Sequence, residues 1–337
     1  MVTRRAFLGT LAGGLLAAPL TAGAQQTAKP PRLCFLTFDS RPTQSKLSSS
    51  RASPVQFDPF FQRLHDLGYV DGQTLTIDYL SADGQGERFP ALASECLRLR
   101  ADIIVVTTTP AAQAAKKATR SIPIVMIPLG DPVATGLVAS LARPGGNVTG
   151  LTFMASGLLA KRLGLLKEAV PSISRVLVLS YLIDPIAAPQ VQELQRAARA
   201  LNVTLLVQNV RSGDDLPAAF DAGVRAHVEG VLTTAESLFA AQRRRVVDLA
   251  ARHRLPGVYP YRAMVDVGGL MAYDSYTPDL VAQTATYVDR ILKGANPAEL
   301  PIERPTKFDL VINLKTAKAL GLTIPPSLWA QADQVIE

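Results

Sequence analysis

Short apolar runs alternate with segments of helical periodicity along most of the sequence, and this alternation constrains the fold more than any other feature. In the first half, apolar runs predict strands at residues 33–38, 75–80, 103–107 and 124–127. Apolar residues three and four positions apart predict helices at 57–67, 89–99 and 111–118. The run Ile103-Ile104-Val105-Val106 is typical of a strand that is buried on both faces. This order predicts an α/β fold, in which helices cover both faces of a parallel sheet.

The same pattern begins again after the turn-forming residues 143–147. Here strands are predicted at 176–180, 205–210, 230–234 and 258–261, and helices at 158–169, 191–201, 216–228 and 239–253. A chain of 337 residues has room for about two domains, so we expect two doubly wound lobes. The last 60 residues contain one helix, 280–292, and one strand, 308–312. They are too few for a third domain and must complete the two lobes.

Residues 1–24 have the three parts of an export signal. Arg4 and Arg5 supply a charged start, an apolar run extends over residues 10–20, and Ala22-Gly23-Ala24 is a small-x-small ending. The paired arginines also match the twin-arginine pattern of bacterial export. Glycines and a proline within the run argue against an uncleaved membrane anchor. We therefore predict a twin-arginine-type signal peptide that is cleaved after Ala24, and a mature protein in the periplasm.

The formal net charge of +7 raises the possibility of nucleic-acid binding. Cleavage of the signal removes Arg4 and Arg5, which lowers this charge to +5. The densest remaining basic run, residues 243–245, lies in a predicted helix with apolar residues at helical spacing, so a solvated helix face explains it. No aromatic platform or zinc-finger spacing accompanies it, and we expect no nucleic-acid partner.

The few histidines and cysteines exclude the commonest metal sites. His65, His227 and His253 lie far apart, and two cysteines are too few for a four-cysteine zinc site or a disulfide-rich scaffold. We expect neither metal nor cofactor. Cys34 lies in a strand pattern and Cys96 on the apolar side of a helix pattern, where buried free thiols are ordinary. Export to an oxidising compartment raises the alternative of a disulfide, but we predict free, buried thiols.

Polar residues that follow the strands of the first half are candidates for ligand binding, because ligands gather beyond the carboxyl ends of parallel strands. These candidates are Asp39 and Ser40, then Thr107, Thr108 and Thr109, and then Asp131. The three threonines precede a predicted helix, whose free amides and adjacent hydroxyls suit a carboxylate. A helix N-cap accounts for only one of these hydroxyls. Asp131 either caps a helix or faces a ligand amine.

Acids and tyrosines occupy the corresponding positions in the second half. Five of the eight tyrosines of the chain follow predicted strands after residue 180, where they can form an amphipathic wall for a small organic ligand. The candidates in this half are Tyr181, Asp184, Glu236, Tyr259, Tyr273 and Asp274. The sequence contains no nucleophile elbow, phosphate-binding loop or dinucleotide-binding glycine motif. Binding without catalysis is therefore the default, and no catalytic residue is predicted.

Several segments together resemble a known family. They are Leu67-Gly68-Tyr69-Val70-Asp71-Gly72-Gln73, Gly130-Asp131-Pro132-Val133, Leu141-Ala142-Arg143-Pro144-Gly145-Gly146-Asn147-Val148-Thr149-Gly150, Gly268-Gly269-Leu270-Met271-Ala272-Tyr273 and Pro305-Thr306-Lys307-Phe308-Asp309-Leu310-Val311-Ile312-Asn313. In this order they are similar to the tryptophan/tyrosine-type substrate-binding proteins of bacterial ABC transporters. The resemblance implies a type I periplasmic-binding-protein fold, with two doubly wound parallel-sheet lobes, a three-stranded hinge and a ligand cleft between the lobes.

The resemblance also implies domain limits and a function. Residues 31–150 and 277–303 would form lobe 1, and residues 151–276 and 304–337 lobe 2. The protein would be a monomer that captures a small amino acid or related carboxylate in the cleft and delivers it to an ABC permease in the inner membrane. The ligand carboxylate would lie at Thr107 to Thr109, and Asp131, Glu236 and Asp274 are the acids available to its amine. The alternatives are a ligand-sensing module for a membrane receptor and an exported hydrolase or isomerase.

Overall fold

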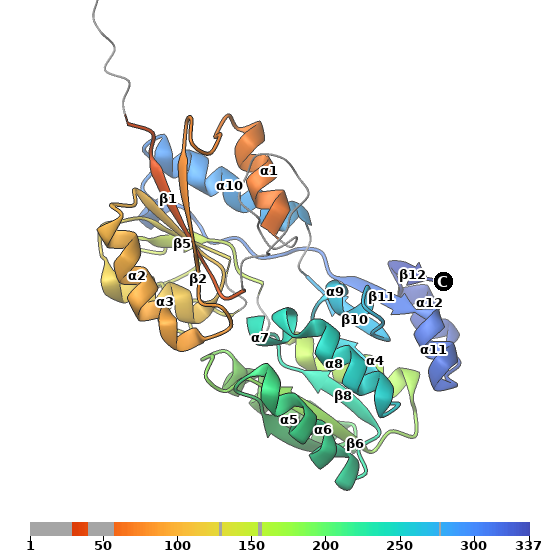
Figure 1. The fold of residues 1–337 in the computed structure, drawn as a ribbon. Helices are drawn as coiled ribbons and strands as arrows, with labels where there is room; N and C mark the ends of the chain where they lie inside the picture. The colour runs from red at the N-terminus through yellow and green to blue at the C-terminus, as the bar shows by residue number, and fades with distance from the viewer. Residues whose placement is uncertain (1–28, 40–56, 128–129, 154–156, 276–277) are drawn as a thin grey trace, which may run out of the picture.

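The computed structural model describes residues 29–39, 57–127, 130–153, 157–275 and 278–337. The strands of this part of the chain form two separate sheets, one in each of two lobes (Figure 1). Sheet 1 has five strands and sheet 2 has seven. The predicted α/β fold with two lobes is therefore confirmed.

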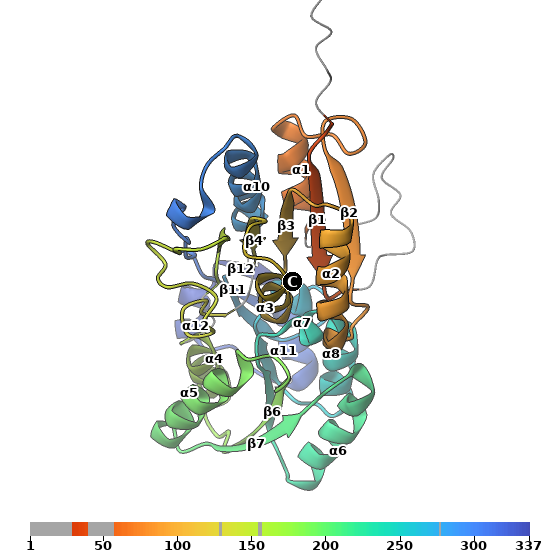
Figure 2. The ribbon, with the colours of Figure 1, turned by 90° about the vertical axis from the view of Figure 1, so that its left-hand side faces the viewer.

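Sheet 1 is parallel throughout and has the strand order β2-β1-β3-β4-β5. Helices cover both of its faces: α1 packs against α10 on one, and α2 packs against α3 on the other, toward the viewer in Figure 2. Its elements are β1 (Arg32–Thr37), α1 (Asp58–Asp66), β2 (Thr76–Ser81), α2 (Phe89–Arg98), β3 (Ile103–Val106), α3 (Thr109–Ala118), β4 (Ile124–Met126), β5 (Val148–Gly150) and α10 (Pro278–Leu292).

The sequence explains the centre of this sheet. All four residues of β3 are completely buried, as an unbroken β-branched run between two helical layers requires. At the edge, Gly150 has a φ of +126°, and a Cβ there would lie 2.5 Å from the Met126 carbonyl oxygen. Only glycine allows β5 to approach β4 in this way.

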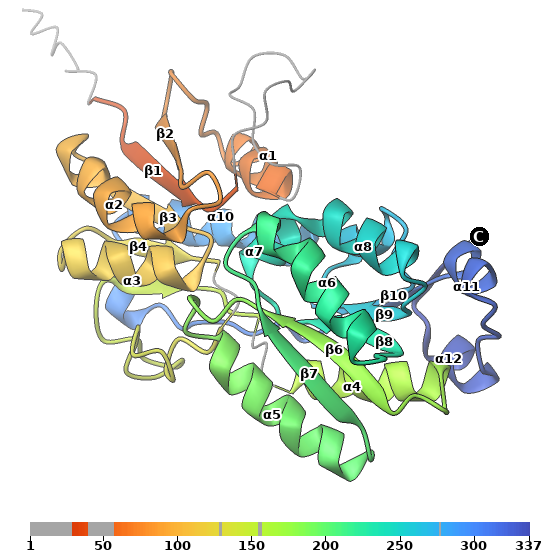
Figure 3. The same ribbon diagram turned by 60° about the horizontal axis from the view of Figure 1, so that its bottom comes forward.

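Sheet 2 has the strand order β12-β11-β10-β9-β8-β6-β7. Figure 3 shows α4 and α5 below this sheet and α6 and α8 above it. Its elements are α4 (Leu158–Ala169), β6 (Arg175–Ser180), α5 (Ala187–Ala200), β7 (Thr204–Asn209), α6 (Leu216–Arg225), β8 (Gly230–Thr233), α7 (Ser237–Ala241), α8 (Arg243–Arg252), β9 (Gly257–Tyr259), α9 (Arg262–Val265), β10 (Met271–Asp274), β11 (Asp309–Asn313), α11 (Leu314–Leu320), α12 (Pro326–Gln331) and β12 (Gln334–Ile336).

Three segments pass between the lobes and contact one another. Leu151, just after β5, forms a parallel bridge with Glu303, and the amide of Thr152 donates to the Glu303 carbonyl at 3.0 Å. The Ser275 hydroxyl, just after β10, donates to the Phe153 carbonyl at 3.5 Å. Between the second and third crossings, α10 returns to sheet 1, where the Tyr69 hydroxyl donates to Asp289 at 3.0 Å.

The structure differs from the predicted elements in several places. The helix expected at 239–253 is two helices, α7 and α8, because the backbone leaves the helical conformation at Gln242. Strand β11 is antiparallel to β10, since it enters sheet 2 from the crossing at the end where β10 leaves it. The predicted elements also do not include β5, α9 and β10, or α11, α12 and β12 of the tail.

The prediction for the two cysteines is wrong. Cys34 of β1 and Cys96 of α2 are both fully buried, as expected, but they form a disulfide with a Cα–Cα distance of 5.8 Å. The bond links residues 62 positions apart and ties α2 to the central part of sheet 1. Each cysteine lies in an apolar pattern, but only the packing of α2 on β1 brings the two sulfurs together.

Candidate functional site

The lobes contact each other at the carboxyl ends of their strands. Phe38, which follows β1, packs edge-on against Tyr181, which follows β6, with ring centroids 6.2 Å apart. Both rings are almost completely buried. Nearby, a Cβ on Gly130 of lobe 1 would lie 2.1 Å from Cγ2 of Ile186 in lobe 2, so the absence of a side chain permits this approach. Polar residues around these contacts form the candidate site, which we call the interlobe site.

Lobe 1 contributes the three threonines at the start of α3. All three are buried. Thr107 donates its hydroxyl to Thr37 at 3.2 Å, and Thr108 is the N-cap of α3, accepting from the Ala111 amide at 3.2 Å. The Thr109 hydroxyl is buried without a hydrogen-bond partner in the described part of the chain. Thus one threonine is a structural cap that accepts from the Ala111 and Ala112 amides, and another presents a free hydroxyl at the start of a ten-residue helix.

Lobe 2 contributes two buried carboxyl groups, Asp184 and Glu236. Asp184 accepts from the Ile186 amide at 3.1 Å at the start of α5, and burial raises its pKa to about 7. Glu236 accepts from the Gln190 side chain at 3.0 Å and from the Thr234 hydroxyl. Burial, and then the charge of Asp184, raise the pKa of Glu236 well above its ordinary value. Two acids this deeply buried favour a positively charged partner.

A buried cation and a third acid lie at the end of the site nearest the crossings. Arg162 of α4 donates Nε to the Tyr273 carbonyl at 3.0 Å. Burial lowers the pKa of its guanidinium to about 10, and the charge of Asp274 opposes this shift. Asp274 accepts from the Arg262 amide at 2.8 Å. Tyr261 belongs to the same cluster, because its pKa is raised first by burial and then by the charges of Glu236 and Asp274.

Tyr181 forms the aromatic side of the site. Burial, followed by the charges of Glu87, Asp184 and Glu236, raises the pKa of its phenol to about 12. The structure therefore brings together eight of the predicted residues, which are Thr107, Thr108, Thr109, Tyr181, Asp184, Glu236, Asp274 and, beside Phe38, Asp39. The Asp39 carbonyl accepts from Ser81 at 2.7 Å. Ser40 lies outside the described residues.

Two predicted residues have local structural contacts instead. Asp131 accepts from the amides of Val133 and Ala134 at 2.9 and 3.2 Å, so its carboxylate caps a turn. The Tyr273 ring stacks on Phe308 with centroids 5.9 Å apart, on the core side of sheet 2. Its carbonyl accepts from Arg162, and its phenol is among the electrostatic neighbours of the same guanidinium.

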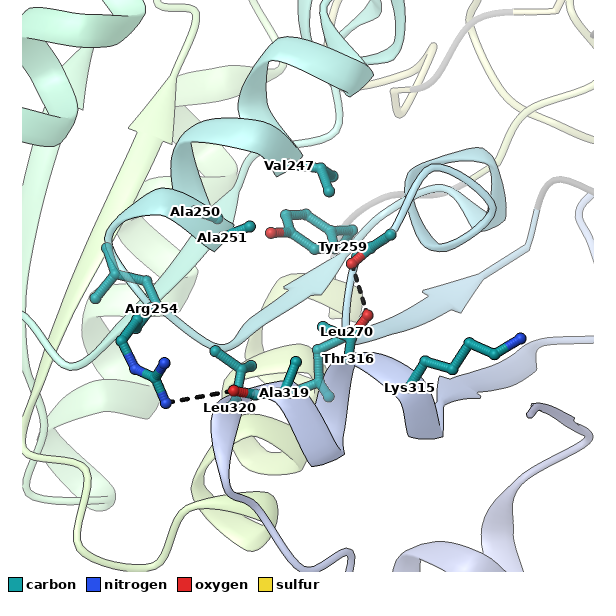
Figure 4. Close-up of a pocket in the computed structure, with 13 residues that line it drawn as sticks. Val247, Ala250, Ala251, Arg254, Tyr259, Leu270, Lys315, Thr316, Ala319 and Leu320 are labelled. Atoms are coloured by element: carbon teal, nitrogen blue, oxygen red, sulfur yellow. Dashed lines mark hydrogen bonds between the residues drawn. The ribbon is translucent and has the colours of Figure 1, made fainter.

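Tyr259 lies in a different cavity. It lines a pocket of about 410 Å³ between α8 and α11, which we call the α8–α11 pocket. In Figure 4 its ring lies beside Val247 and Ala251 of α8. Tyr259 ends β9 and alternates with Val258, which faces the helices of the opposite layer. The strand-end pattern located Tyr259 along the chain but not the face on which its ring packs.

Sequence reasoning missed Arg162 and Gln190. Both lie in the buried stripes of their helices: Arg162 with Leu159, Leu163 and Leu166, and Gln190 with Val191 and Leu194. A polar residue within an otherwise apolar helical stripe is a usable signal, because burying it requires specific partners. No group of three or more metal-ligating side chains occurs in the part of the chain that the structure describes.

The comparison with known families decides the identity of the fold and its role. A family model described as ABC transporter substrate binding protein matches residues 54–336, most of the chain. The chain belongs to this family. The resemblance found in the sequence is thereby confirmed, and so is the type I periplasmic-binding-protein fold.

Relatives of this substrate-binding protein include proteins with known ligands. The tyrosine-binding protein of Clostridioides difficile (strain R20291) is 27% identical over 263 residues, which cover 78% of this chain and 75% of the relative. The structure of an ABC domain from Streptococcus pneumoniae in complex with L-Trp is 27% identical, with a TM-score of 0.77 over 90% of this chain and all of the other. A conserved domain protein from Vibrio cholerae is 26% identical, with a TM-score of 0.81 over 91% of this chain and all of the other.

These matches agree with the predicted class of function. The matched proteins of the family are solute-binding proteins rather than enzymes. Substrate-binding proteins of ABC transporters are extracytoplasmic. Among the described residues of this substrate-binding protein, no helix has the length and apolar character needed to cross a membrane.

Proposed function

We propose that this substrate-binding protein captures an aromatic L-amino acid, or a related carboxylate, in the interlobe site and delivers it to the permease of an ABC importer. The observation that carries the proposal is the pair of buried acids, Asp184 and Glu236, in the same site as the free Thr109 hydroxyl at the start of α3. An α-amino acid carries an ammonium group that suits the acids of lobe 2 and a carboxylate that suits the start of α3 in lobe 1.

The ammonium group is assigned to the acid pair. Two buried carboxyl groups whose pKa values are raised have no cation among their hydrogen-bonding partners. These partners are the backbone amides of Ile186, Tyr181 and Glu236 itself and the side chains of Gln190 and Thr234. A ligand ammonium supplies this cation and favours the ionised forms. Of the acids considered from the sequence, Asp131 is the least suitable, because two backbone amides already hold its carboxylate.

The carboxylate is assigned to lobe 1. In the first turn of α3, Pro110 has no amide hydrogen and the Ala111 and Ala112 amides already donate to Thr108, so Thr109 is left to contact the carboxylate. Its hydroxyl has no partner in the described part of the chain and lies at the positive end of the helix dipole. Phe38 and Tyr181 supply an aromatic wall from both lobes. The ligands named for the relatives, tyrosine and L-Trp, support an aromatic amino acid as ligand here.

Capture is proposed to occur by closure of the lobes about the three crossing segments. The buried contact between Phe38 and Tyr181 corresponds to a closed arrangement. Ligand binding shifts the population toward this form only as far as the ligand prefers it.

The proposal includes the limits of the lobes and the place of action. Lobe 1 is residues 31–150 and 277–303, and lobe 2 is residues 151–276 and 304–337. The helix α10 supports these limits, because it follows the second crossing and packs against α1. Residues 1–24, which lie outside the described residues, are proposed as a cleaved twin-arginine-type signal, and the periplasm as the compartment of the mature monomer.

A thermal-shift screen of the mature protein tests the proposal. L-Tyrosine, L-tryptophan and L-phenylalanine should raise the melting temperature with increasing concentration, because a ligand that binds only the folded state stabilises it. Glu236→Gln should reduce this effect, whereas substitution of the exposed acid Asp221 on α6 should leave it unchanged. Absence of any shift with these and other amino acids at large excess would reject the proposal. Mass spectrometry of recovered ligand separates binding from turnover.

A further inference from the structure

Arg162 is a buried cation with an incomplete set of partners. It is 2% exposed and lies in the first turns of α4, within the apolar stripe of Leu159, Leu163 and Leu166. Its Nε donates to the Tyr273 carbonyl, which fixes the guanidinium at the end of β10. Its Nη1 is also buried but has no hydrogen-bond partner in the described part of the chain. Burying an unsatisfied charged donor costs free energy, so packing alone does not explain why an arginine occupies position 162.

The neighbouring acid does not supply the missing partner. Asp274 lies close enough for its charge to affect Arg162, but no ion pair within 4.0 Å joins the two. Asp274 accepts from the Arg262 amide at 2.8 Å instead. The carboxylate therefore offsets the charge of Arg162 from a distance and leaves Nη1 free to donate.

Tyr261 presents a second free group in the same place. Its hydroxyl is buried without a hydrogen-bond partner among the described residues, and its electrostatic neighbours include Arg162 and Asp274. Arg162 belongs to α4, below sheet 2, whereas Tyr261 precedes α9. Arg162 bonds the Tyr273 carbonyl, and Tyr261 precedes Arg262, whose amide donates to Asp274. Both donors therefore lie near the carboxyl end of β10, on the same lobe as the acid pair.

We propose that Arg162 and Tyr261 form a subsite that receives an oxygen atom from the far end of the ligand. This inference rests on the proposed function, in which Asp184 and Glu236 hold the ammonium group and Thr109 the carboxylate. The subsite is a third polar contact for the ligand, in addition to the contacts of its ammonium group and its carboxylate. It selects amino acids whose side chain ends in a hydroxyl or a carboxylate. It disfavours otherwise similar ligands that end in a hydrocarbon, because these leave Nη1 unpaired.

Matched ligands test the proposal by calorimetric titration of the mature protein. L-Tyrosine and 4-carboxy-L-phenylalanine carry a hydroxyl and a carboxylate on the same ring, and L-phenylalanine carries neither. We expect at least one of the first two to bind at least about 10-fold more tightly than L-phenylalanine, since a hydrogen bond to a charged donor typically accounts for such a factor. Which of the two binds better identifies the oxygen as hydroxyl or carboxylate.

Three variants assign the preference to the subsite. Arg162→Met should bring the affinity ratio of the oxygen-bearing ligand to L-phenylalanine close to one, while the affinity for L-phenylalanine changes little. Tyr261→Phe removes a single hydroxyl and should lower the same ratio, which keeps the test decisive if Arg162→Met does not fold. Tyr259→Phe is the matched control, because Tyr259 lies in the α8–α11 pocket, and its ratio should equal that of the wild type.

The possible outcomes separate this inference from the proposed function. Equal affinity of the wild type for all three ligands overturns the subsite but leaves amino-acid binding intact. A uniform loss of affinity for all three in both Arg162→Met and Tyr261→Phe also overturns it, because a purely structural role predicts this result. Absence of binding by every amino acid in the wild type rejects the proposed function, and the subsite with it.

Discussion

Asp184 is the residue whose ionisation depends most clearly on folding. Its ordinary pKa is 3.8, and burial raises the pKa in the folded protein to about 7. Between these values the folded state holds a proton that the unfolded state has released. The free energy of unfolding therefore falls as the pH rises from about 4 to 7. The stability that the proton on Asp184 contributes at low pH is lost above about 7.

The variant Asp184→Asn tests this ionisation. Asparagine cannot ionise, and its oxygen can still accept from the Ile186 amide. We expect the variant to be more stable than the wild type at pH 8, by at least about 1 kcal/mol, with the difference shrinking as the pH falls toward 4. Urea unfolding between pH 4 and 8 measures this difference. A constant difference, or the same profile for Asp221→Asn on the exposed face of α6, would contradict a raised pKa at Asp184.

Buried polar residues also mark the limit of prediction at this scale. Asp184, Glu236 and Thr109 were predicted because they follow strands, and the carboxyl ends of parallel strands share one edge. Arg162 and Gln190 were missed because they lie within helices, and their roles depend on which neighbours the packed helix meets. Tyr259 lines the α8–α11 pocket, and its position along the strand does not specify where its ring packs.

At the scale of elements, the start of α3 combines two functions in adjacent residues. Thr108 caps the helix, whereas the Thr109 hydroxyl has no partner in the described part of the chain. We expect Thr108→Val to lower the free energy of unfolding by about 1 kcal/mol. Thr109→Val should leave stability nearly unchanged but lower the affinity for an amino acid by about 10-fold. Denaturant unfolding and calorimetric titration of both variants measure the two effects, and equal behaviour of the variants would contradict the division of roles.

The disulfide is the second feature at this scale, since it joins β1 to α2. Cross-linking residues 62 positions apart restricts the unfolded chain, so Cys34→Ala/Cys96→Ala should lose about 2–4 kcal/mol of stability. Denaturant unfolding of the oxidised protein and of the variant measures this loss. Thiol labelling of the exported protein after unfolding without reductant provides the check, because detection of two free thiols would contradict the bond.

The elements themselves were largely predictable because their signals are local. The buried run of β3 and the capped, alanine-rich α3 follow from residues that are adjacent in sequence. The pairing of Cys34 with Cys96, the antiparallel direction of β11 and the short elements of the tail were not predicted. The disulfide and the direction of β11 depend on contacts between distant parts of the chain. Helix α11, by contrast, has local signals, an N-cap at Asn313 and a left-handed glycine at Gly321, that the periodicity did not use.

At the scale of the whole molecule, the two lobes and their crossings explain why distant residues form one site. Thr109 lies in lobe 1, and Asp184, Glu236 and Arg162 lie in lobe 2. The contact of Phe38 with Tyr181 and that of Gly130 with Ile186 bring these groups together only when the lobes are closed. A ligand that bridges the lobes is therefore the simplest way to stabilise this arrangement.

The crystal structure of the mature protein with L-tyrosine tests the central claim most directly. We predict one ligand between the lobes, with its ammonium group at Asp184 and Glu236, its carboxylate at Thr109 and the start of α3, and its phenol toward Arg162. Continuous electron density for this pose, in the closed arrangement, would support the account. Crystals grown at saturating L-tyrosine that show the ligand only in the α8–α11 pocket, or no ligand at all, would contradict it.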